Sequence, residues 1–209
     1  MAEFISLYSG SSGNSSVVRC GEHYLIVDMG KGVRTTTAAL KALGLAVSDC
    51  DGILITHEHS DHVKGLSTFL KKNPLPVYGA ADTLDFLDAN GIVPPSCELN
   101  TLEGREEDVG AFGVQSFPTS HDVPCVGYRI HTPDGKTMTI ATDLGVLTPP
   151  VHEALSGCDP ELFSEGLRVS LYNYMNGTGF DLPLHKWFGG MKVPRTTLPP
   201  NYIERIVEE

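Results

Sequence analysis

The sequence predicts an α+β fold in which strands joined by turns flank a central stretch of alternating strands and helices. The first 28 residues contain short β-branched and aromatic runs that are interrupted by Gly- and Ser-rich turns. The middle of the chain alternates short apolar runs with stretches that have helical spacing. Strand-like runs return from residue 113 onward, and turn sequences such as TPDG at residues 132–135 join them.

The N-terminal strands are predicted at FISLYS, SVVRC and HYLIVD. SGSSGNS at residues 9–15 separates the first two, and Gly-Glu at residues 21–22 separates the second from the third. We therefore expect a strand, a turn and a hairpin over residues 4–28.

The central segment is predicted to have a βαβα order. A helix over residues 35–44 has Gly44 as its stop signal, and a helix over residues 62–72 ends before Asn73 and Pro74. The further elements, in order along the chain, are strands at 51–56 and 75–79, a helix at 81–91, and strands at 113–120, 124–131 and 136–143. No repeat or linker interrupts residues 1–158, which we interpret as one domain.

Composition excludes several classes of protein. The 209 residues include 15 Lys and Arg against 26 Asp and Glu, and a net charge of -11 argues against a broad basic surface that follows nucleic acid. No apolar run has the length of a membrane span, and the N-terminus lacks a signal-peptide pattern. Five cysteines without a CxxC pair indicate reduced thiols, so we expect a cytoplasmic protein.

The most informative segment is THEHSDH at residues 56–62, which directly follows the apolar run ILI. Its position at the carboxyl end of a predicted strand can aim His57 and His59 in one direction and Asp61 and His62 in another. Imidazole nitrogens with a carboxylate suit Zn²⁺ and tolerate Mn²⁺ or Fe²⁺. A polar loop with solvated histidines is the alternative, but four ligand-type residues in six positions favour a site for two metal ions.

THEHSDH fits the HxHxDH signature of the metallo-β-lactamase superfamily. SGSSGNS, LIVDMG, FPTSHD and ATDLG resemble the other motifs of its YycJ-type branch, in the same order over residues 9–145. The resemblance implies an αββα sandwich with a dinuclear metal site at one edge of its two sheets. The ligands it implies are, for the first metal, His57, His59 and His121, for the second, Asp61 and His62, and as a bridge between them, Asp143.

The residues themselves support these assignments unevenly. His121 lies in the turn-forming TSHD after a predicted strand, which is a sensible place for a loop ligand. Asp143 follows a strand, where an N-cap or turn aspartate is also common. The resemblance implies that Asp28 orients a ligand histidine, although an ordinary turn residue is an equal alternative from the sequence alone.

The chemistry expected of this site is hydrolysis by a metal-bound hydroxide, because two adjacent metal ions lower the pKa of a shared water toward about 7. Asp61 is predicted to orient this nucleophile and to accept its proton. SGSSGNS lacks the GxSxG pattern of a serine nucleophile, so we interpret it as a turn near the metals that offers backbone N–H groups to an anionic substrate.

Residues 159–209 depart from the pattern that the resemblance predicts. The expected apolar strand and the Gly-His-Leu-Ser turn with the last metal histidine are not found, and Pro160 and Gly166 interrupt the segment. We interpret it as a divergent tail that is frame-shifted or partly disordered, so that the second half of the sandwich is incomplete. We assign no ligand role to the other histidines, which are His23, His131, His152 and His185. The second metal is therefore predicted to bind more weakly than the first.

The resemblance implies a metal-dependent phosphodiesterase that acts on DNA as an exonuclease. An enzyme that acts on DNA ends has to neutralise few phosphates, which suits an acidic chain. A thioesterase or lactonase, which would direct the same hydroxide at a carbonyl, is one alternative, and a zinc-binding remnant with little catalysis is another. A flavodiiron-type oxidoreductase is disfavoured, because such sites resemble HxExD and His59 occupies the middle position here.

Overall fold

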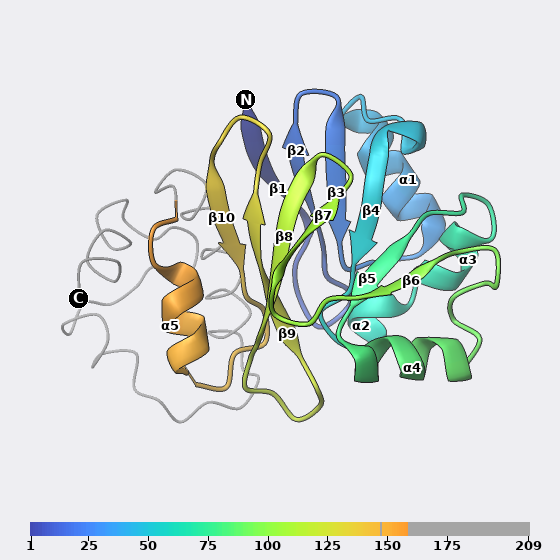
Figure 1. Cartoon of the computed structure of the whole chain (residues 1–209). Helices are drawn as coiled ribbons and strands as arrows, with labels where there is room; N and C mark the ends of the chain where they lie inside the picture. The colour runs from blue at the N-terminus through green and yellow to red at the C-terminus, as the bar shows by residue number, and fades with distance from the viewer. Residues whose placement is uncertain (147, 159–209) are drawn as a thin grey trace.

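Two β-sheets lie face to face in the computed structural model, which describes residues 1–146 and 148–158 (Figure 1). The first sheet has six strands: β1 (Ala2–Tyr8), β2 (Ser15–Cys20), β3 (His23–Val27), β4 (Cys50–Leu54), β5 (Val77–Gly79) and β6 (Leu99–Thr101). The second has four, in the spatial order β10 (Thr137–Ile140), β9 (Val126–His131), β8 (Phe112–Pro118) and β7 (Glu106–Val109).

Strand direction changes within the first sheet. The strands β1, β2 and β3 form antiparallel pairs, whereas β3, β4, β5 and β6 pair in parallel. The second sheet is antiparallel throughout. The parallel strands end at a common edge of the sheet, and this edge carries the loop with residues 56–62.

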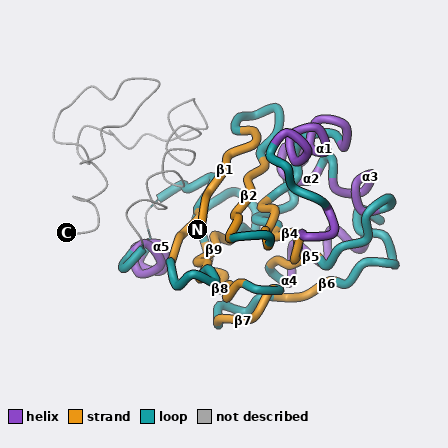
Figure 2. Tube along the Cα trace, turned by 90° about the horizontal axis from the view of Figure 1, so that it is seen from above, coloured by secondary structure: helices purple, strands orange, loops and turns teal. Residues whose placement is uncertain are grey.

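Helices cover the outer faces of both sheets (Figures 1 and 2). On the first sheet, β-strand residues pack against side chains of α1 (Val33–Ala42), α2 (Ser60–Val63), α3 (Leu66–Leu70) and α4 (Ala81–Ala89). On the second sheet, α5 (Pro149–Leu155) packs against Phe117 and Ala141. The described residues thus form the predicted αββα sandwich, with α5 as the one described helix on the second sheet.

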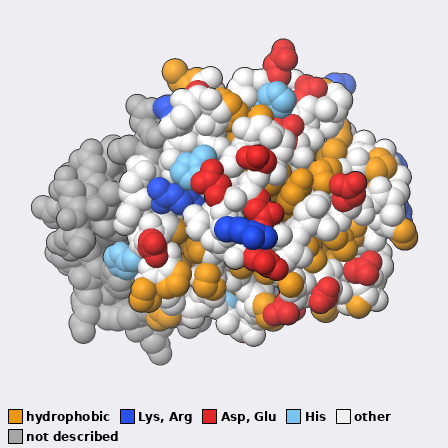
Figure 3. All heavy atoms as spheres, viewed as in Figure 1, with side chains coloured by type: hydrophobic (Ala, Val, Ile, Leu, Met, Phe, Trp, Pro, Cys, Tyr) orange, Lys and Arg blue, Asp and Glu red, His pale blue; other side chains and the backbone are white. Residues whose placement is uncertain are grey.

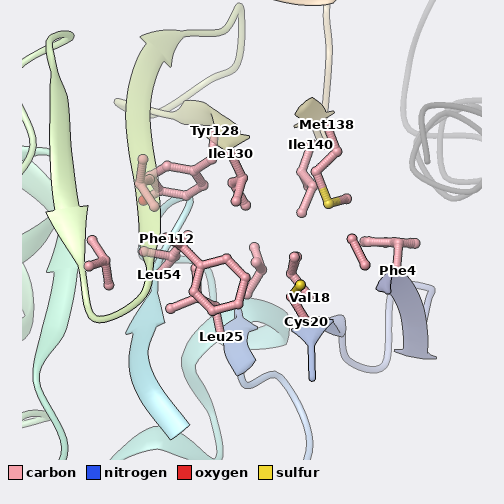
Figure 4. Close-up of a cluster of buried hydrophobic side chains, with 14 of the residues drawn as sticks. Phe4, Val18, Cys20, Leu25, Leu54, Phe112, Tyr128, Ile130, Met138 and Ile140 are labelled. Atoms are coloured by element: carbon pink, nitrogen blue, oxygen red, sulfur yellow. The ribbon is translucent and has the colours of Figure 1, made fainter. Parts of the chain in front are cut away.

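The main core lies between the two sheets (Figure 4). Leu25 and Leu54 of the first sheet face Phe112 and Tyr128 of the second, and all four side chains are almost completely buried. Neighbouring residues on a strand point to opposite faces, so Ile26 packs against the helices instead. Burial on both faces explains why residues 24–27 of β3 and residues 53–54 of β4 are apolar without alternation.

The helix predicted over residues 62–72 is divided in two, which corrects the sequence-based expectation. A Cβ atom on Gly65 would lie 1.9 Å from the carbonyl oxygen of Lys31, so the chain between α2 and α3 is pressed against a distant loop. The N–H of Gly65 donates to the carbonyl of Met29 rather than within a helix. Tertiary packing therefore overrides the helical spacing of this segment.

Two strands were not predicted from the sequence. β6 has only three residues, and β7, with the sequence EEDV, has little apolar pattern because it is an edge strand in which Val109 alone is buried. The interpretation of residues 159–209 as a divergent tail, and the exclusion of His185 as a ligand, concern residues outside the described part of the chain. Among the described helices, none combines the length and apolarity needed to cross a bilayer.

Candidate metal centre

The loop that follows β4 places four of the predicted ligands. His57 and His59 precede α2, whose first residues, Ser60 and Asp61, lead to His62. The N–H of His62 donates to the carbonyl of His59, so the helix begins inside the motif and turns Asp61 and His62 away from the direction of the loop. His57 and His62 are buried, and His59 is partly exposed.

Three imidazoles form the first group of candidate ligands: His57, His59 and His121. Nε2 of His57 lies 3.2 Å from Nδ1 of His59, which lies 3.3 Å from Nε2 of His121. His121 comes from the loop after β8, on the second sheet. The three histidines that the resemblance assigned to the first metal are thus brought together from both sheets.

The second group consists of His57, His62 and Asp143. Oδ2 of Asp143 lies 3.1 Å from Nε2 of His62, and Asp143 follows β10 on the second sheet. His57 belongs to both groups, so the two candidate cation positions are neighbours.

Asp61 lies beside the second group but is not part of it. Its Oδ2 is 3.7 Å from Nε2 of His62 and accepts a hydrogen bond of 3.1 Å from Nδ2 of Asn14. The side chain of Asp61 is 30% exposed, so water can reach it. Its role as a ligand remains a prediction.

Asp28 is buried behind the second group. Nδ1 of His62 lies 2.8 Å from Oδ2 of Asp28, which is the contact with a ligand histidine that the resemblance implied. Asp28 also accepts hydrogen bonds from the backbone N–H and the hydroxyl of Thr56. A carboxylate held by so many donors fixes the ring that it contacts.

Backbone conformation distinguishes two of these carboxylates. Asp28 has φ of 59° and Asp143 has φ of 52°, and no other non-glycine residue of the described chain has a positive φ. Aspartate tolerates this left-handed region better than most residues, but the conformation still costs free energy. Such conformations persist where the surrounding structure imposes them, and both occur here at the candidate metal centre.

The Gly-rich segment at residues 9–15 does lie beside the candidate ligands, through Asn14. The backbone N–H of Asn14 donates to the carbonyl of Asp61, and its own carbonyl accepts from Gly30. The N–H groups of Gly10 and Gly13 are also bonded within the segment. The expectation that this turn offers backbone donors to substrate is therefore wrong for these three N–H groups, and Asn14 contacts Asp61 through both its backbone and its side chain.

Charge at the site is set by burial and by neighbouring groups. Burial, followed by the charge of His62, holds the pKa of His57 well below its ordinary value, so this ring is neutral and keeps a lone pair for a cation. Burial opposes a charge on His62, but the carboxylates of Asp28 and Asp143 outweigh it and raise its pKa to about 10. Burial likewise opposes the charge on Asp143, whose pKa is nevertheless lowered by His62.

The spacing of these groups fits divalent cations. Two nitrogens that bind one zinc ion at about 2.0–2.1 Å with tetrahedral angles lie about 3.3–3.4 Å apart. The separations of 3.2 and 3.3 Å in the first group match this value. Oδ2 of Asp143 is buried and receives no well-directed hydrogen bond from the described residues. This charged oxygen is therefore available to bind a cation.

Residues that the sequence reasoning missed surround these groups. Oδ1 of Asp122 lies 3.2 Å from Nε2 of His121 and 3.6 Å from Nε2 of His59. Sγ of Cys125 lies 3.6 Å from Nδ1 of His57. In the sequence, Asp122 is distinguished only by its position next to His121, and Cys125 only by its position in a turn. Neither signal is specific for a residue near a metal site.

The remaining described histidines lie elsewhere. His23 contacts Asp51 at 3.1 Å, and His131 contacts Glu106 at 3.5 Å. His152 is exposed on α5. None of these three is in a group of candidate ligands within the described residues.

This chain is similar to known proteins over most of its length. A family model described as a β-lactamase superfamily domain matches residues 23–173. The exodeoxyribonuclease YycJ of Bacillus anthracis is 32% identical over 170 residues, a match that covers 80% of this chain and 64% of that protein. A ribonuclease Z of Clostridium kluyveri is 30% identical over 120 residues, covering 51% of this chain and 39% of the relative. The chain thus spans less than two thirds of the length of either relative.

A solved structure shows the same fold. The metallo-β-lactamase fold protein YhfI from Bacillus subtilis superposes with a TM-score of 0.61 at 17% sequence identity. The superposition covers 75% of this chain and 67% of that protein. At this identity the likeness concerns the arrangement of sheets and helices.

Proposed function

We propose, from the premise that this chain belongs to the metallo-β-lactamase superfamily, that it is a metal-dependent phosphodiesterase acting on DNA ends. The observation that carries the proposal is the membership of His57 in both groups of candidate ligands. It makes the two cation positions neighbours, and two adjacent cations suit the in-line displacement at a phosphodiester.

The first group, His57, His59 and His121, would hold one cation, and His62 with Asp143 and Asp61 would hold the second. We propose zinc for both positions, because imidazole nitrogens dominate the donor set, with manganese or iron as alternatives. Divalent ions bound there supply Lewis acidity, which activates water and polarises a phosphoryl oxygen.

Asp61 accepts the proton of the attacking water in this proposal. Its carboxylate is partly exposed and therefore within reach of solvent, and the amide of Asn14 holds its orientation. The buried Asp28 instead orients the ring of His62 and takes no part in proton transfer with water. The two carboxylates are thus assigned different roles by their exposure.

DNA ends are the proposed substrate for two reasons. The YycJ relative is named an exodeoxyribonuclease, and the acidic chain favours a substrate with few phosphates to neutralise. On the face of the molecule seen in Figure 3, acidic side chains are widely spread, and the Lys and Arg side chains visible there form no continuous stripe. A surface of this kind suits the end of a strand better than a long duplex.

The experiment that tests this function compares substrates on the purified full chain supplied with zinc or manganese. We expect release of nucleotides from linear DNA, no cleavage of a covalently closed circle, and turnover of bis-p-nitrophenyl phosphate above that of a thioester. His59→Ala should abolish turnover, whereas His152→Ala on α5 should leave it unchanged. A thioesterase or lactonase would reverse the preference between model substrates, RNA cleavage without DNA cleavage would indicate a ribonuclease, and zinc binding without turnover would indicate the non-catalytic alternative.

A further inference from the structure

Thr56 lies against Asp28 and beside the rings of His57 and His62. Its side chain is completely buried, and its Oγ1 lies 2.9 Å from Oδ2 and 3.1 Å from Oδ1 of Asp28. The same oxygen lies 3.0 Å from Nδ1 of His57. The backbone N–H of Thr56 also donates to Asp28 at 2.9 Å, which fixes the residue against this carboxylate.

The direction of the hydrogen bonds among Thr56, Asp28 and His57 follows from the protons that each group carries. A hydroxyl has one proton to donate and two lone pairs that accept, whereas an ionised carboxylate only accepts. A hydrogen bond to a carboxylate is about twice as strong as one to a neutral acceptor. The hydroxyl of Thr56 therefore donates to Asp28, and its lone pairs are left to accept the Nδ1–H of His57.

This arrangement leaves the Nε2 lone pair of His57 directed at the first group, where it lies 3.2 Å from Nδ1 of His59. Asp28 directly accepts the Nδ1–H of His62, whose Nε2 faces Asp143. One buried carboxylate thus keeps a proton on Nδ1 of two rings, directly for His62 and through Thr56 for His57.

We propose that Thr56 is a positioning residue that holds His57 in the tautomer with a proton on Nδ1, and so keeps Nε2 free for a cation. The inference rests on the metal-binding role proposed for His57. It adds to that role a hydroxyl that connects both groups of candidate ligands to Asp28.

The neighbouring thiol of Cys125 is a weaker partner for the same ring. Its Sγ lies 3.6 Å from Nδ1 of His57, against 3.0 Å for the hydroxyl, and a thiol sulfur is a weak acceptor. Loss of the Thr56 hydroxyl therefore leaves Nδ1 of His57 with a poor partner, and the opposite tautomer becomes accessible. In that tautomer the proton on Nε2 would block the cation.

The first test uses metal-free wild-type protein, so that its result does not depend on metal binding or activity. Nitrogen-15 NMR of the histidine rings reports which nitrogen carries the proton. We expect His57 to be neutral and protonated on Nδ1. Protonation on Nε2 would overturn the proposal, even if the protein bound zinc and cleaved DNA.

The second test measures zinc affinity by calorimetry for Thr56→Val, which keeps the shape but removes the hydroxyl, and for Thr56→Ser, which retains it. We expect Thr56→Val to lose about 10- to 100-fold in zinc affinity, as is typical when a group that orients a metal-binding histidine is removed. Thr56→Ser should bind zinc with the affinity of the wild type. Thr83→Val, at another completely buried threonine, should also leave the affinity unchanged. Equal affinities for Thr56→Val and wild type would overturn the proposal, and the ring spectrum of the wild type decides alone should Thr56→Val fail to fold.

Discussion

Nδ1 of His62 lies 2.8 Å from Oδ2 of Asp28, and both side chains are almost completely buried. The substitution Asp28→Asn keeps the size of the side chain but replaces one acceptor oxygen with an N–H donor. We expect the second zinc equivalent to be affected most, with binding weakened by about 10- to 100-fold, because Asp28 orients His62 directly and contacts His57 only through Thr56. Calorimetric titration measures this loss.

Asp51→Asn is a matched control for this prediction, because Asp51 also contacts a histidine, His23 at 3.1 Å, but lies outside the candidate metal centre. The control should bind two zinc ions as the wild type does. Unchanged binding of both ions by Asp28→Asn would show that the buried carboxylate does not orient a ligand.

Asn14 donates its side-chain N–H to Asp61 at 3.1 Å, and its Oδ1 accepts from the N–H of Gly10 at 2.9 Å. A hydrogen bond to a charged group contributes about 1.5–3 kcal/mol, so Asn14→Ala is expected to lower kcat about 10- to 100-fold on DNA ends. Because Asp61 is assigned to proton transfer rather than to substrate binding, KM should change little. Asn90→Ala at the end of α4 is the control, and an equal loss in both variants would contradict a specific role for Asn14.

Zinc binding should displace a proton from His62. In metal-free protein the pKa of this ring is about 10, so below pH 10 it carries two protons, and a cation must replace the one on Nε2. Affinity for the second equivalent is therefore expected to rise about tenfold per pH unit from pH 7 to 8.5, since fewer protons compete as the pH increases. Titrations across this range measure the slope, and an affinity that does not depend on pH would contradict the protonated state of His62.

Gly30 lies where its own loop meets the loop of Asn14 and the helix α2, and a Cβ atom there would be 1.6 Å from the carbonyl oxygen of Asp61 and 2.5 Å from the backbone nitrogen of Asn14. Gly30→Ala is expected to destabilise the fold, and each kcal/mol lost lowers Tm by about 2–4 °C in a protein of this size. Gly32→Ala is the control, because its Cβ would meet no atom within 4 Å. Equal Tm values for the two variants would show that the loops adjust without cost.

Much of the site could be predicted because its residues are close in sequence. His57, His59, Asp61 and His62 lie within six positions after a buried strand, so local geometry alone brings them to one edge of the sheet. His121 lies far along the chain, and so does Asp143. These two residues reach the site only because the second sheet packs on the first, and only the family resemblance predicted that they would be ligands.

Other parts depended on contacts that no local pattern records. The division of the helix at residues 62–72 results from the close approach of Gly65 to Lys31. The roles of Thr56 and Asn14 arise from hydrogen bonds to partners 28 and 47 positions away, in Asp28 and Asp61. Residues of these types are common before motifs and in turns, so their identity alone does not predict such contacts.

Titration of the metal-free full chain with zinc, followed by calorimetry and elemental analysis, tests the central claim most directly. Two neighbouring groups of ligands that share His57 should bind two zinc ions, the first more tightly than the second, and His59→Ala should weaken the first. Protein that stays metal-free with zinc in excess would contradict the metal centre itself, and two equally tight equivalents would contradict the weaker second site.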